Sequence, residues 1–322
     1  MRLIRGLHNV PSEFAGCVAT IGNFDGLHLG HRRILTDLAA AAAQHSVPTL
    51  VILFEPQPKE YFAPEHAPAR LASFRDKCQD LTDAGVEYLL VLPFNESLRS
   101  MSADAFIQQI LVNAIGVRHL IVGDDFRFGC DRSGDYAALV QAGAQFGFTV
   151  RDTPTHLVND ERVSSTRVRD VLAGDDLSQA AHLLGRRYRM NGRVAYGRQL
   201  GRQLDTPTAN VMIKRSRLVM QGVYAVAVDV DGQWLSGVAN LGVKPTISGT
   251  PEPSLEVHLF DYQGNLYGKH LSVVFMKKIR NEMKFDGLDA LKAAIDSDKT
   301  EARAYFESAP LTSELIDNRL DA

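Results

Sequence analysis

The sequence has few cysteines and no long apolar run. Its three cysteines, Cys17, Cys78 and Cys130, lie far apart without a CxxC pair, so we expect free thiols rather than a disulfide or metal framework. The most apolar runs, Leu50–Phe54 and Tyr88–Leu92, fall far short of the roughly 18 residues that a membrane helix needs. The N-terminal residues, MRLIRGLHNV, lack the apolar stretch of a signal peptide. These features predict a cytoplasmic protein that does not associate with membranes.

The chain also lacks a surplus of positive charge and any P-loop. Its net charge of −3 argues against a dedicated nucleic-acid binder but leaves room for local basic pockets. No GxxxxGK[ST] motif occurs, which excludes the ordinary P-loop kinases. The 322 residues, 45% of them apolar, suffice for two domains with buried cores.

Strands and helices alternate in the first half of the chain. Apolar runs predict strands at 17–24, 49–54, 88–94 and 119–122, and helical spacing predicts helices at 34–42, 71–84, 103–114 and 136–146. This order is typical of a doubly wound α/β domain with a parallel sheet. In such sheets ligands bind outside the carboxyl ends of the strands.

The pattern changes near Gly185. Short strand candidates separated by turn residues follow, at 189–195, 223–230, 234–239, 254–260 and 271–276, and they predict an antiparallel β-barrel or sandwich. One helix at about 288–306 closes this domain, and we expect the polar tail from Ser308 to fray. The predicted domains are therefore 1–185 and 186–307, followed by the tail 308–322.

The segment Gly22–His31 reads GNFDGLHLGH and lies where the first strand meets the first helix. Glycines there allow the backbone to approach phosphate closely. If the helix begins near His28, the imidazoles of His28 and His31 lie on one face of its first turn, beside free N–H groups and the positive end of the helix dipole. This arrangement suits a triphosphate whose charge grows during displacement at phosphorus.

Three further segments follow strands or open a helix: FEPQP at 54–58, VGDDFRFG at 122–129 and VSSTRVR at 163–169. A serine or threonine in the last segment is suited to cap a helix, and Arg169 offers a fork for phosphate. In the second half, a glycine-rich stretch precedes Pro-Thr-Ala-Asn, and Thr208 and Asn210 alternate on one face of a strand-like segment. Their neutral oxygens suit Mg²⁺ and phosphate together.

The first half resembles the HxGH nucleotidyltransferase superfamily, with a Rossmann-like sheet, and in particular the adenylyltransferase module of bacterial FAD synthetases. The resemblance rests on GNFDGLHLGH and the three segments in this order. It implies attack by the phosphate of FMN on the α-phosphorus of ATP, with no covalent intermediate. It also implies that His28, His31 and Arg169 are catalytic. The nucleotide-binding residues that it implies are Gly22, Asn23, Phe24, Asp25, Gly26, Asp125, Ser165 and Thr166.

The second half resembles riboflavin kinase, and the whole chain resembles the bacterial bifunctional riboflavin kinase/FMN adenylyltransferase family. The matching segments are GRQLGR at 197–202, PTAN at 207–210, GVY at 222–224, GVANLG at 237–242 with Pro245 and Thr246, EVHLFD at 256–261, LYG at 266–268 and IRNEMKF at 279–285. The resemblance implies a barrel with a closing helix, Glu256 as the base for the ribityl hydroxyl, and Thr208 and Asn210 as ligands of Mg²⁺. It implies ATP as co-substrate, riboflavin and FMN as substrates, and FMN and FAD as products. The cofactor-binding residues that it implies are Gly192, Gly197, Gly201, Arg202, Thr208, Asn210, Arg280 and Glu282.

Three alternatives remain at this point. Another HxGH enzyme, such as a pantetheine-phosphate or nicotinate-mononucleotide nucleotidyltransferase, would leave the β-rich half unexplained. A flavin-responsive regulator would be favoured by loss of the histidines, Thr208, Asn210 or Glu256, and all of these are present. A chain whose kinase half only binds flavin is favoured by Asp205, which stands where the family usually has glycine. A second departure is Gln57, where the family usually has histidine.

Asp205 generates a prediction. If its carboxylate lies beside the phosphates of ATP, charge repulsion opposes binding, so Asp205→Gly lowers the apparent KM for ATP in riboflavin phosphorylation only. Steady-state kinetics of both half-reactions measure this. An unchanged KM would place the Asp205 side chain away from the nucleotide.

Overall fold

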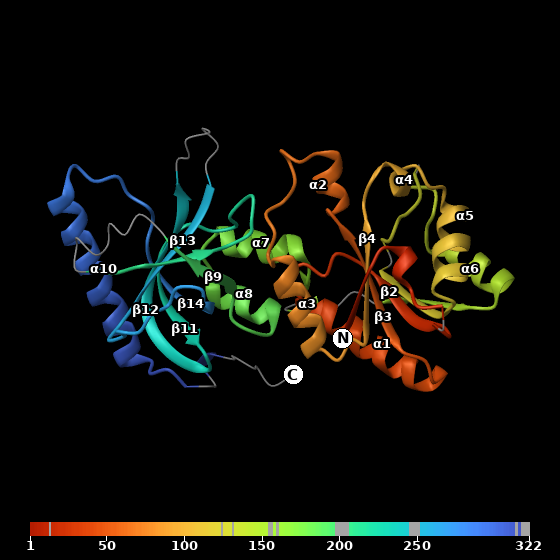
Figure 1. Ribbon diagram of the computed structural model, residues 1–322, viewed down its shortest axis with the longest axis horizontal. Helices are drawn as coiled ribbons and strands as arrows, with labels where there is room; N and C mark the ends of the chain where they lie inside the picture. The colour runs from red at the N-terminus through yellow and green to blue at the C-terminus, as the bar shows by residue number, and fades with distance from the viewer. Residues whose placement is uncertain are drawn as a thin grey trace. The chain divides into compact units, whose positions relative to one another are not determined.

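The computed structural model describes residues 1–12, 14–123, 125–130, 132–153, 157–158, 161–196, 206–244, 252–312 and 315–316. It contains two compact units (Figure 1). The first comprises residues 1–68 and 74–163, and the second comprises residues 69–73 and 164–322. Some residues singled out from the sequence lie outside the described ranges: Gly197, Gly201, Arg202, Asp205, Pro245 and Thr246.

A six-stranded parallel sheet forms the first unit, in the order β1-β4-β3-β2-β5-β6. The strands are β1 (Arg2–Arg5), β2 (Cys17–Ile21), β3 (Thr49–Glu55), β4 (Tyr88–Pro93), β5 (Val117–Gly123) and β6 (Thr149–Thr153). The four central strands are the apolar runs that the sequence predicts. Strands β1 and β6 carry exposed polar side chains at the sheet edges, so no apolar run marks them.

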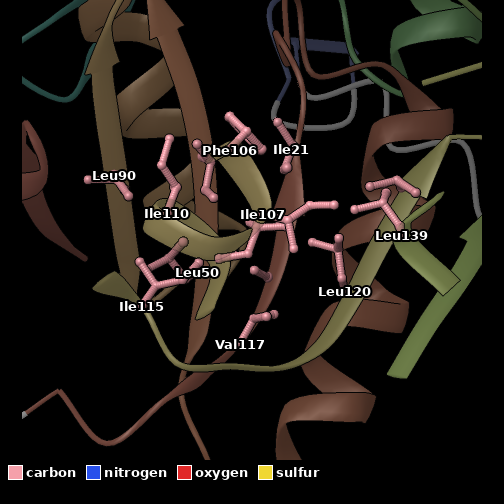
Figure 2. Close-up of a cluster of buried hydrophobic side chains, with 14 of the residues drawn as sticks. Ile21, Leu50, Leu90, Phe106, Ile107, Ile110, Ile115, Val117, Leu120 and Leu139 are labelled. Atoms are coloured by element: carbon pink, nitrogen blue, oxygen red, sulfur yellow. The ribbon is translucent and has the colours of Figure 1, made fainter. Parts of the chain in front are cut away.

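Successive residues of the central strands point to opposite faces of the sheet and enter two cores. On one face, Val18, Val51 and Leu89 pack with Leu35 and Leu38 of helix α1 (Leu29–His45) and with helix α3 (Phe74–Asp83). On the other face, residues such as Leu50 and Leu120 pack with the π-helix η2 (Phe106–Ala114) and helix α6 (Tyr136–Phe146). Figure 2 shows this second cluster, with Ile107 and Ile110 of η2 lying among the strand side chains.

The remaining elements of this unit are short. They are η1 (Leu7–Asn9), α2 (Pro58–Phe62), α4 (Glu96–Arg99), α5 (Ala103–Ala105) and the hairpin of β7 (Leu157–Val158) and β8 (Glu161–Arg162). Helix α5 runs directly into η2, so the helix predicted at 103–114 is present but winds more widely than an α-helix over most of its length.

The second unit is a closed antiparallel barrel in the order β10-β13-β12-β11-β14-β9. Its strands are β9 (Arg189–Ala195), β10 (Ala209–Met212), β11 (Gly222–Val230), β12 (Gln233–Lys244), β13 (Glu252–Leu259) and β14 (His270–Arg280). Helix α10 (Leu288–Ser308) packs Ala302 against Val223, Val238 and Phe260 of the barrel. The structure therefore confirms the predicted fold class, and it decides between barrel and sandwich in favour of the barrel.

Two helices precede the barrel within the second unit: α7 (Ser165–Ala173) and α8 (Leu177–Leu184). Asp175, between them, forms an ion pair with Lys278 of β14 and lies 3.4 Å from the hydroxyl of Tyr224 in β11. Burial raises the pKa of Tyr224, so this hydroxyl stays protonated at neutral pH and needs hydrogen-bond partners inside the protein. The two helices are thus attached to the barrel through a partly buried polar contact.

Part of the C-terminal tail is packed. Ile316 is 6% exposed and lies in a cluster with Ala227, Val274 and Met276 of the barrel. The backbone oxygen of Leu315 accepts a hydrogen bond from Arg187 at 2.6 Å. The expectation that the tail frays from Ser308 is wrong for these two residues, because Leu311, Leu315 and Ile316 pack together against the barrel and anchor the tail.

The attachment of α7 and α8 generates a stability prediction. The domain boundary at 185/186 stays a prediction, and a fragment starting at Arg186 lacks both helices, while a fragment starting at Ser164 keeps them. Leu183 and Leu184 of α8 are buried. Burial of each leucine side chain contributes about 1.5 kcal/mol to the free energy of unfolding. Since the melting temperature changes by about 2 °C for each kcal/mol, we expect the 186–322 fragment to melt at least about 6 °C below the 164–322 fragment. Thermal denaturation followed by circular dichroism measures the difference, and equal melting temperatures would contradict it.

Candidate active sites

The parallel sheet has one point where the strand order reverses direction. From β2 the chain continues through β3 to β4 on one side, and then returns to place β5 on the other side of β2. In open parallel sheets, the loops that leave the carboxyl ends of the strands on either side of such a point diverge, and the crevice between them is the usual ligand site. The loop after β2 begins at Gly22, and the loop after β5 carries Asp125.

Residues 22–28 form a loop with an unusual backbone. Phe24, Gly26 and Leu27 have φ values of 46°, 85° and 43°, a region that residues other than glycine adopt rarely. Phe24 and Leu27 are each 1% exposed, so their burial holds the loop in this conformation. Asp25, between them, is also buried. A strained loop fixed by its own packing presents its backbone groups in one arrangement.

His28 and His31 are brought together as the sequence predicts. Helix α1 begins at Leu29, and the Nδ1 atom of His28 accepts a hydrogen bond from the backbone N–H of His31 at 3.3 Å. The two rings stack with their centroids 3.7 Å apart, and Phe24 covers His31 at 4.8 Å. A methyl group at Gly30 would lie 3.2 Å from the His28 ring, which is tighter than an ordinary contact, so glycine here favours the close approach of the ring.

The environment of His31 lowers its pKa well below the ordinary value. Burial is the main cause, and the neighbouring His28 and the positive charge of Lys77 act in the same direction. Its Nδ1 atom is buried and has no hydrogen-bond partner among the described residues. Gln57, the first departure from the family pattern, is 5% exposed, and its Nε2 atom is likewise without a described partner. Buried polar atoms without partners are uncommon in folded proteins and favour a ligand at this edge of the sheet.

Lys77 of α3 is a residue that the sequence analysis did not single out. Its side chain is 1% exposed, and its Nζ lies 3.8 Å from Oε1 of Glu55, at the end of β3. A buried lysine is rare unless it is paired. The spacing in the sequence could have predicted this burial, because Phe74, Lys77 and Leu81 lie on one face of the helix.

The remaining predicted residues of the first half are more accessible or lie elsewhere. Asp125 is exposed and forms an ion pair with Arg162 at 3.4 Å, and Asn23 is exposed. Ser165, Thr166 and Arg169 lie in α7, which belongs to the second compact unit.

In α7 the structure confirms the predicted serine cap. Ser164 is the cap, and its Oγ accepts the backbone N–H of Arg167 at 3.2 Å. Side chains of Arg169, Tyr188 and Arg215 donate to backbone oxygens of residues 69–71 at 2.6, 3.2 and 2.8 Å. Arg169 is therefore held in place by a backbone segment of its own unit.

The barrel gathers polar side chains around Glu256. In the strand register, Glu256 of β13 lies opposite Asn210 of β10 on one side and opposite Asn240 of β12 on the other. The Thr208 hydroxyl lies 3.5 Å from Oε2 of Glu256. Lys244, the last residue of β12, places its Nζ 2.5 Å from Oε1 of Glu256 and 3.0 Å from Oδ1 of Asn210. Lys244 is a second residue that the sequence analysis missed, because it reads as an ordinary surface lysine at a strand end.

Two pockets of the barrel meet at Thr208. One, of about 570 Å³, is lined by Thr208, Asn210, Val194, Val257 and the loop 262–267. The other, of about 350 Å³, is lined by Thr208, Glu256 and Asn240 together with a largely apolar wall that includes Val223, Val238, Phe285, Leu291 and Ile295. His258 shares a strand face with Glu256, as the alternation predicts, and lines the second pocket.

Arg280 and Glu282 border the second pocket. The Arg280 guanidinium donates two hydrogen bonds, at 2.8 and 2.7 Å, to the buried carboxylate of Asp298 in α10. It also lies over the aromatic ring of Phe285. Glu282 accepts a hydrogen bond from Asn240 at 3.4 Å. Arg280 therefore fixes the pocket wall to the closing helix.

Gly192 lies within β9 rather than in a loop. A methyl group there would lie 2.7 Å from a methyl group of Val211 in β10, so close packing of the two strands accounts for the glycine. Among the described residues, no group of three or more His, Cys, Asp or Glu side chains is placed to hold a metal ion. The described helices include none long and apolar enough to cross a membrane.

A parallel sheet with a paired-histidine loop at its switch point, and a barrel whose two pockets meet beside a carboxylate, define a two-domain transferase. The FAD synthetase family matches residues 10–167, and the riboflavin kinase family matches residues 184–306. The bifunctional riboflavin kinase/FMN adenylyltransferase of Pseudomonas fluorescens is 53% identical over 304 residues, covering 94% of this chain and 97% of that protein. The protein of that name from Escherichia coli K12 is 47% identical over 310 residues, covering 95% and 98%.

The chain belongs to the bifunctional riboflavin kinase/FMN adenylyltransferase family. It phosphorylates riboflavin to FMN with ATP, and it adenylylates FMN with ATP to FAD and pyrophosphate. A crystal structure titled as a macrolide-efflux protein from Streptococcus pneumoniae has a similar fold, with a TM-score of 0.79, 27% identity, and coverage of 94% of this chain and 99% of that one.

The environment of His31 generates a pH prediction. In the unfolded chain a histidine takes up a proton near pH 6.5, while the folded protein keeps His31 neutral to lower pH. Unfolding therefore takes up a proton below pH 6.5. As the pH decreases from 6.5, the free energy of unfolding falls by about 1.4 kcal/mol for each pH unit, until the pH reaches the pKa of His31 in the folded protein. Nuclear magnetic resonance titration of the histidine Cε1–H signals, assigned with His31→Gln, measures the pKa. A midpoint for His31 at or above 6.5 would contradict the prediction.

Proposed function

We propose that riboflavin is phosphorylated where the two barrel pockets meet, and that FMN is adenylylated at the crevice beside His28 and His31. The first assignment is carried by Glu256, which lines the 350 Å³ pocket within 3.5 Å of Thr208, the residue that both pockets share. A base and a donor site that meet at one residue are what direct transfer between two bound molecules requires.

The 350 Å³ pocket suits riboflavin. Its apolar wall of Val223, Val238, Leu291 and Ile295 matches a flat aromatic ring system, and its polar end carries Glu256 and Asn240. The 570 Å³ pocket suits ATP. Tyr267, at its edge, stacks on the exposed Tyr196 with ring centroids 4.0 Å apart, a surface fitted to an adenine ring.

In the kinase step, Glu256 accepts the proton of the terminal ribityl hydroxyl as its oxygen bonds to the γ-phosphorus, and ADP leaves. A carboxylate is suited to this role because its oxygens accept a proton and because Glu256 lies beside Thr208, which lines both pockets. The oxygens of Thr208 and Asn210 are hard donors that fit Mg²⁺, which usually keeps several waters and binds phosphates with only one or two protein ligands. The ion would neutralise charge on the phosphates when bound.

In the adenylyl step, the phosphate of FMN attacks the α-phosphorus of ATP, and pyrophosphate leaves. His28 and His31, at the amino end of α1, donate hydrogen bonds to phosphate oxygens beside the positive end of the helix dipole. The loop 22–26 supplies backbone contacts, and Asp125 contributes to the nucleotide site by resemblance to the family. Both steps consume ATP, and the three cysteines are unpaired, which favours a cytoplasmic location.

An aromatic group of the first unit suits the flavin ring of FMN. Tyr61 and Phe62 of α2 contact Phe94 with ring centroids 5.4 and 5.6 Å apart, and Phe54 contacts Phe94 at 6.0 Å. Phe62 is 61% exposed, so one aromatic face is open to a ligand. The group follows β3 and β4 at the carboxyl edge of the sheet, as the crevice does.

Two substitutions test both assignments on the same full-length chain. Glu256→Gln keeps shape but cannot accept the proton, so we expect kcat for riboflavin phosphorylation to fall by roughly 10²–10⁴ while FMN adenylylation is unchanged. His31→Ala removes one stabilising group, so adenylylation falls by about 10²–10³ while phosphorylation is unchanged. Each half-reaction is followed by chromatographic separation of riboflavin, FMN and FAD. His28→Ala repeats the second test.

The two variants serve as controls for each other, because each retains the activity that the other loses. If Glu256→Gln still phosphorylates riboflavin at the wild-type rate, Glu256 is not the base. If either variant loses both activities, the loss reflects misfolding of that variant, and circular dichroism of the purified protein identifies this case.

A further inference from the structure

We propose that Lys244 is a phosphate-binding residue of the kinase centre. In the structure its ammonium group contacts Glu256 and Asn210, and when ATP binds it moves to the phosphate that is transferred. The proposal rests on the kinase site proposed above and adds a residue that neither the sequence motifs nor the family matches single out.

The position of the ammonium group is defined by two contacts. Its Nζ lies 2.5 Å from Oε1 of Glu256 and 3.0 Å from Oδ1 of Asn210. Asn210 lines the larger pocket, and Glu256 lines the smaller one. A positive charge that bridges these two side chains lies at the junction of the pockets, where a phosphoryl group must pass from donor to acceptor.

The ion pair contributes little to the stability of the barrel. Lys244 and Glu256 are 49% and 29% exposed, and pairs of this kind contribute about 0–1 kcal/mol. A purely structural role therefore does not require a lysine here. Lysine has a flexible stem and three donors, which allows the ammonium group to exchange one anionic partner for another.

Other basic side chains near the pockets are already bound to acidic partners outside the centre. In the described part of the chain, Arg280 is held by Asp298 through two hydrogen bonds, and Lys299 is held by Asp296 at 2.7 Å. Lys244 differs because its partners are the side chains that we assign to the reaction. A kinase without a P-loop lysine still needs positive charge at the γ-phosphate, and Lys244 supplies it.

Movement of Lys244 would also release the base. While the ammonium group contacts Glu256, it occupies one of the two carboxylate oxygens. The triphosphate brings more negative charge than one carboxylate, so the ammonium group transfers to it. Glu256 is then available to the ribityl hydroxyl only when nucleotide is present.

The test compares Lys244→Gln, which removes the charge, with Lys244→Arg, which keeps it. For Lys244→Gln we expect kcat/KM for ATP in riboflavin phosphorylation to fall at least about tenfold, and up to about 10²-fold. The loss in Lys244→Arg is smaller. Because ADP lacks the transferred phosphate, its inhibition constant in the same assay changes less than about twofold. The KM for riboflavin also stays within about twofold.

A matched control is Lys277→Gln. Lys277 of β14 is 46% exposed and pairs with Glu301 at 2.9 Å, and it lines neither pocket. We expect it to leave phosphorylation unchanged. FMN adenylylation and the melting temperature of every variant report whether the chain is folded.

Three results would overturn the proposal. If Lys244→Gln phosphorylates riboflavin at the wild-type rate, Lys244 has no role in the reaction. Faster phosphorylation would mean that Lys244 only blocks the base. If binding of ATP and of ADP is weakened equally, Lys244 acts away from the transferred phosphate. Glu256→Gln in the same assay tests the kinase site independently of Lys244. If the site is correctly assigned, this variant no longer phosphorylates riboflavin.

Discussion

The chemistry of the second unit depends on the backbone hydrogen bonds that close its barrel. Strand β13 pairs with β10 on one edge and with β12 on the other, so Glu256 faces Asn210 and Asn240 at once. A shift of one residue in either pairing would turn these side chains to opposite faces. The register also brings Lys244, at the end of β12, back to Glu256 and Asn210. A single carboxylate thus gains a neutral amide on each side and a movable cation.

In the first unit, the parallel arrangement of the strands positions the residues of the candidate site. Its strands are all parallel, so each loop from a carboxyl end leaves the sheet at the same edge, and the reversal beside β2 separates two of them. The loop before α1 is strained at Phe24 and Leu27, and burial of both side chains stabilises it. Burial then has a second consequence, because it lowers the pKa of His31 and leaves this ring neutral and without a described partner at Nδ1. The same packing that fixes the loop prepares the site for a ligand.

Much of the architecture could be read from the sequence because it depends on local patterns. Apolar runs located the four central strands of the sheet, and the change of rhythm near Gly185 separated parallel from antiparallel structure. In the sheet and the barrel, the strands that escaped have no apolar run: the edge strands β1 and β6, and the short strand β10, which was recognised only as strand-like. Helix α8 escaped as well, although five of its residues are buried. The packing of Leu311, Leu315 and Ile316 also escaped, since three apolar side chains in a short polar tail make no apolar run.

The candidate sites divide in the same way. The sequence by itself determined that His28 and His31 share a helical turn and that Thr208 and Asn210 share a strand face, because spacing along a regular element fixes direction. It also determined the family, through motifs in a fixed order. Only the tertiary structure decided that Lys77 is buried beside Glu55 and that Lys244 bridges Glu256 and Asn210. Those contacts join residues from 12 to 34 positions apart, and no local rule of helix or strand geometry extends over such distances.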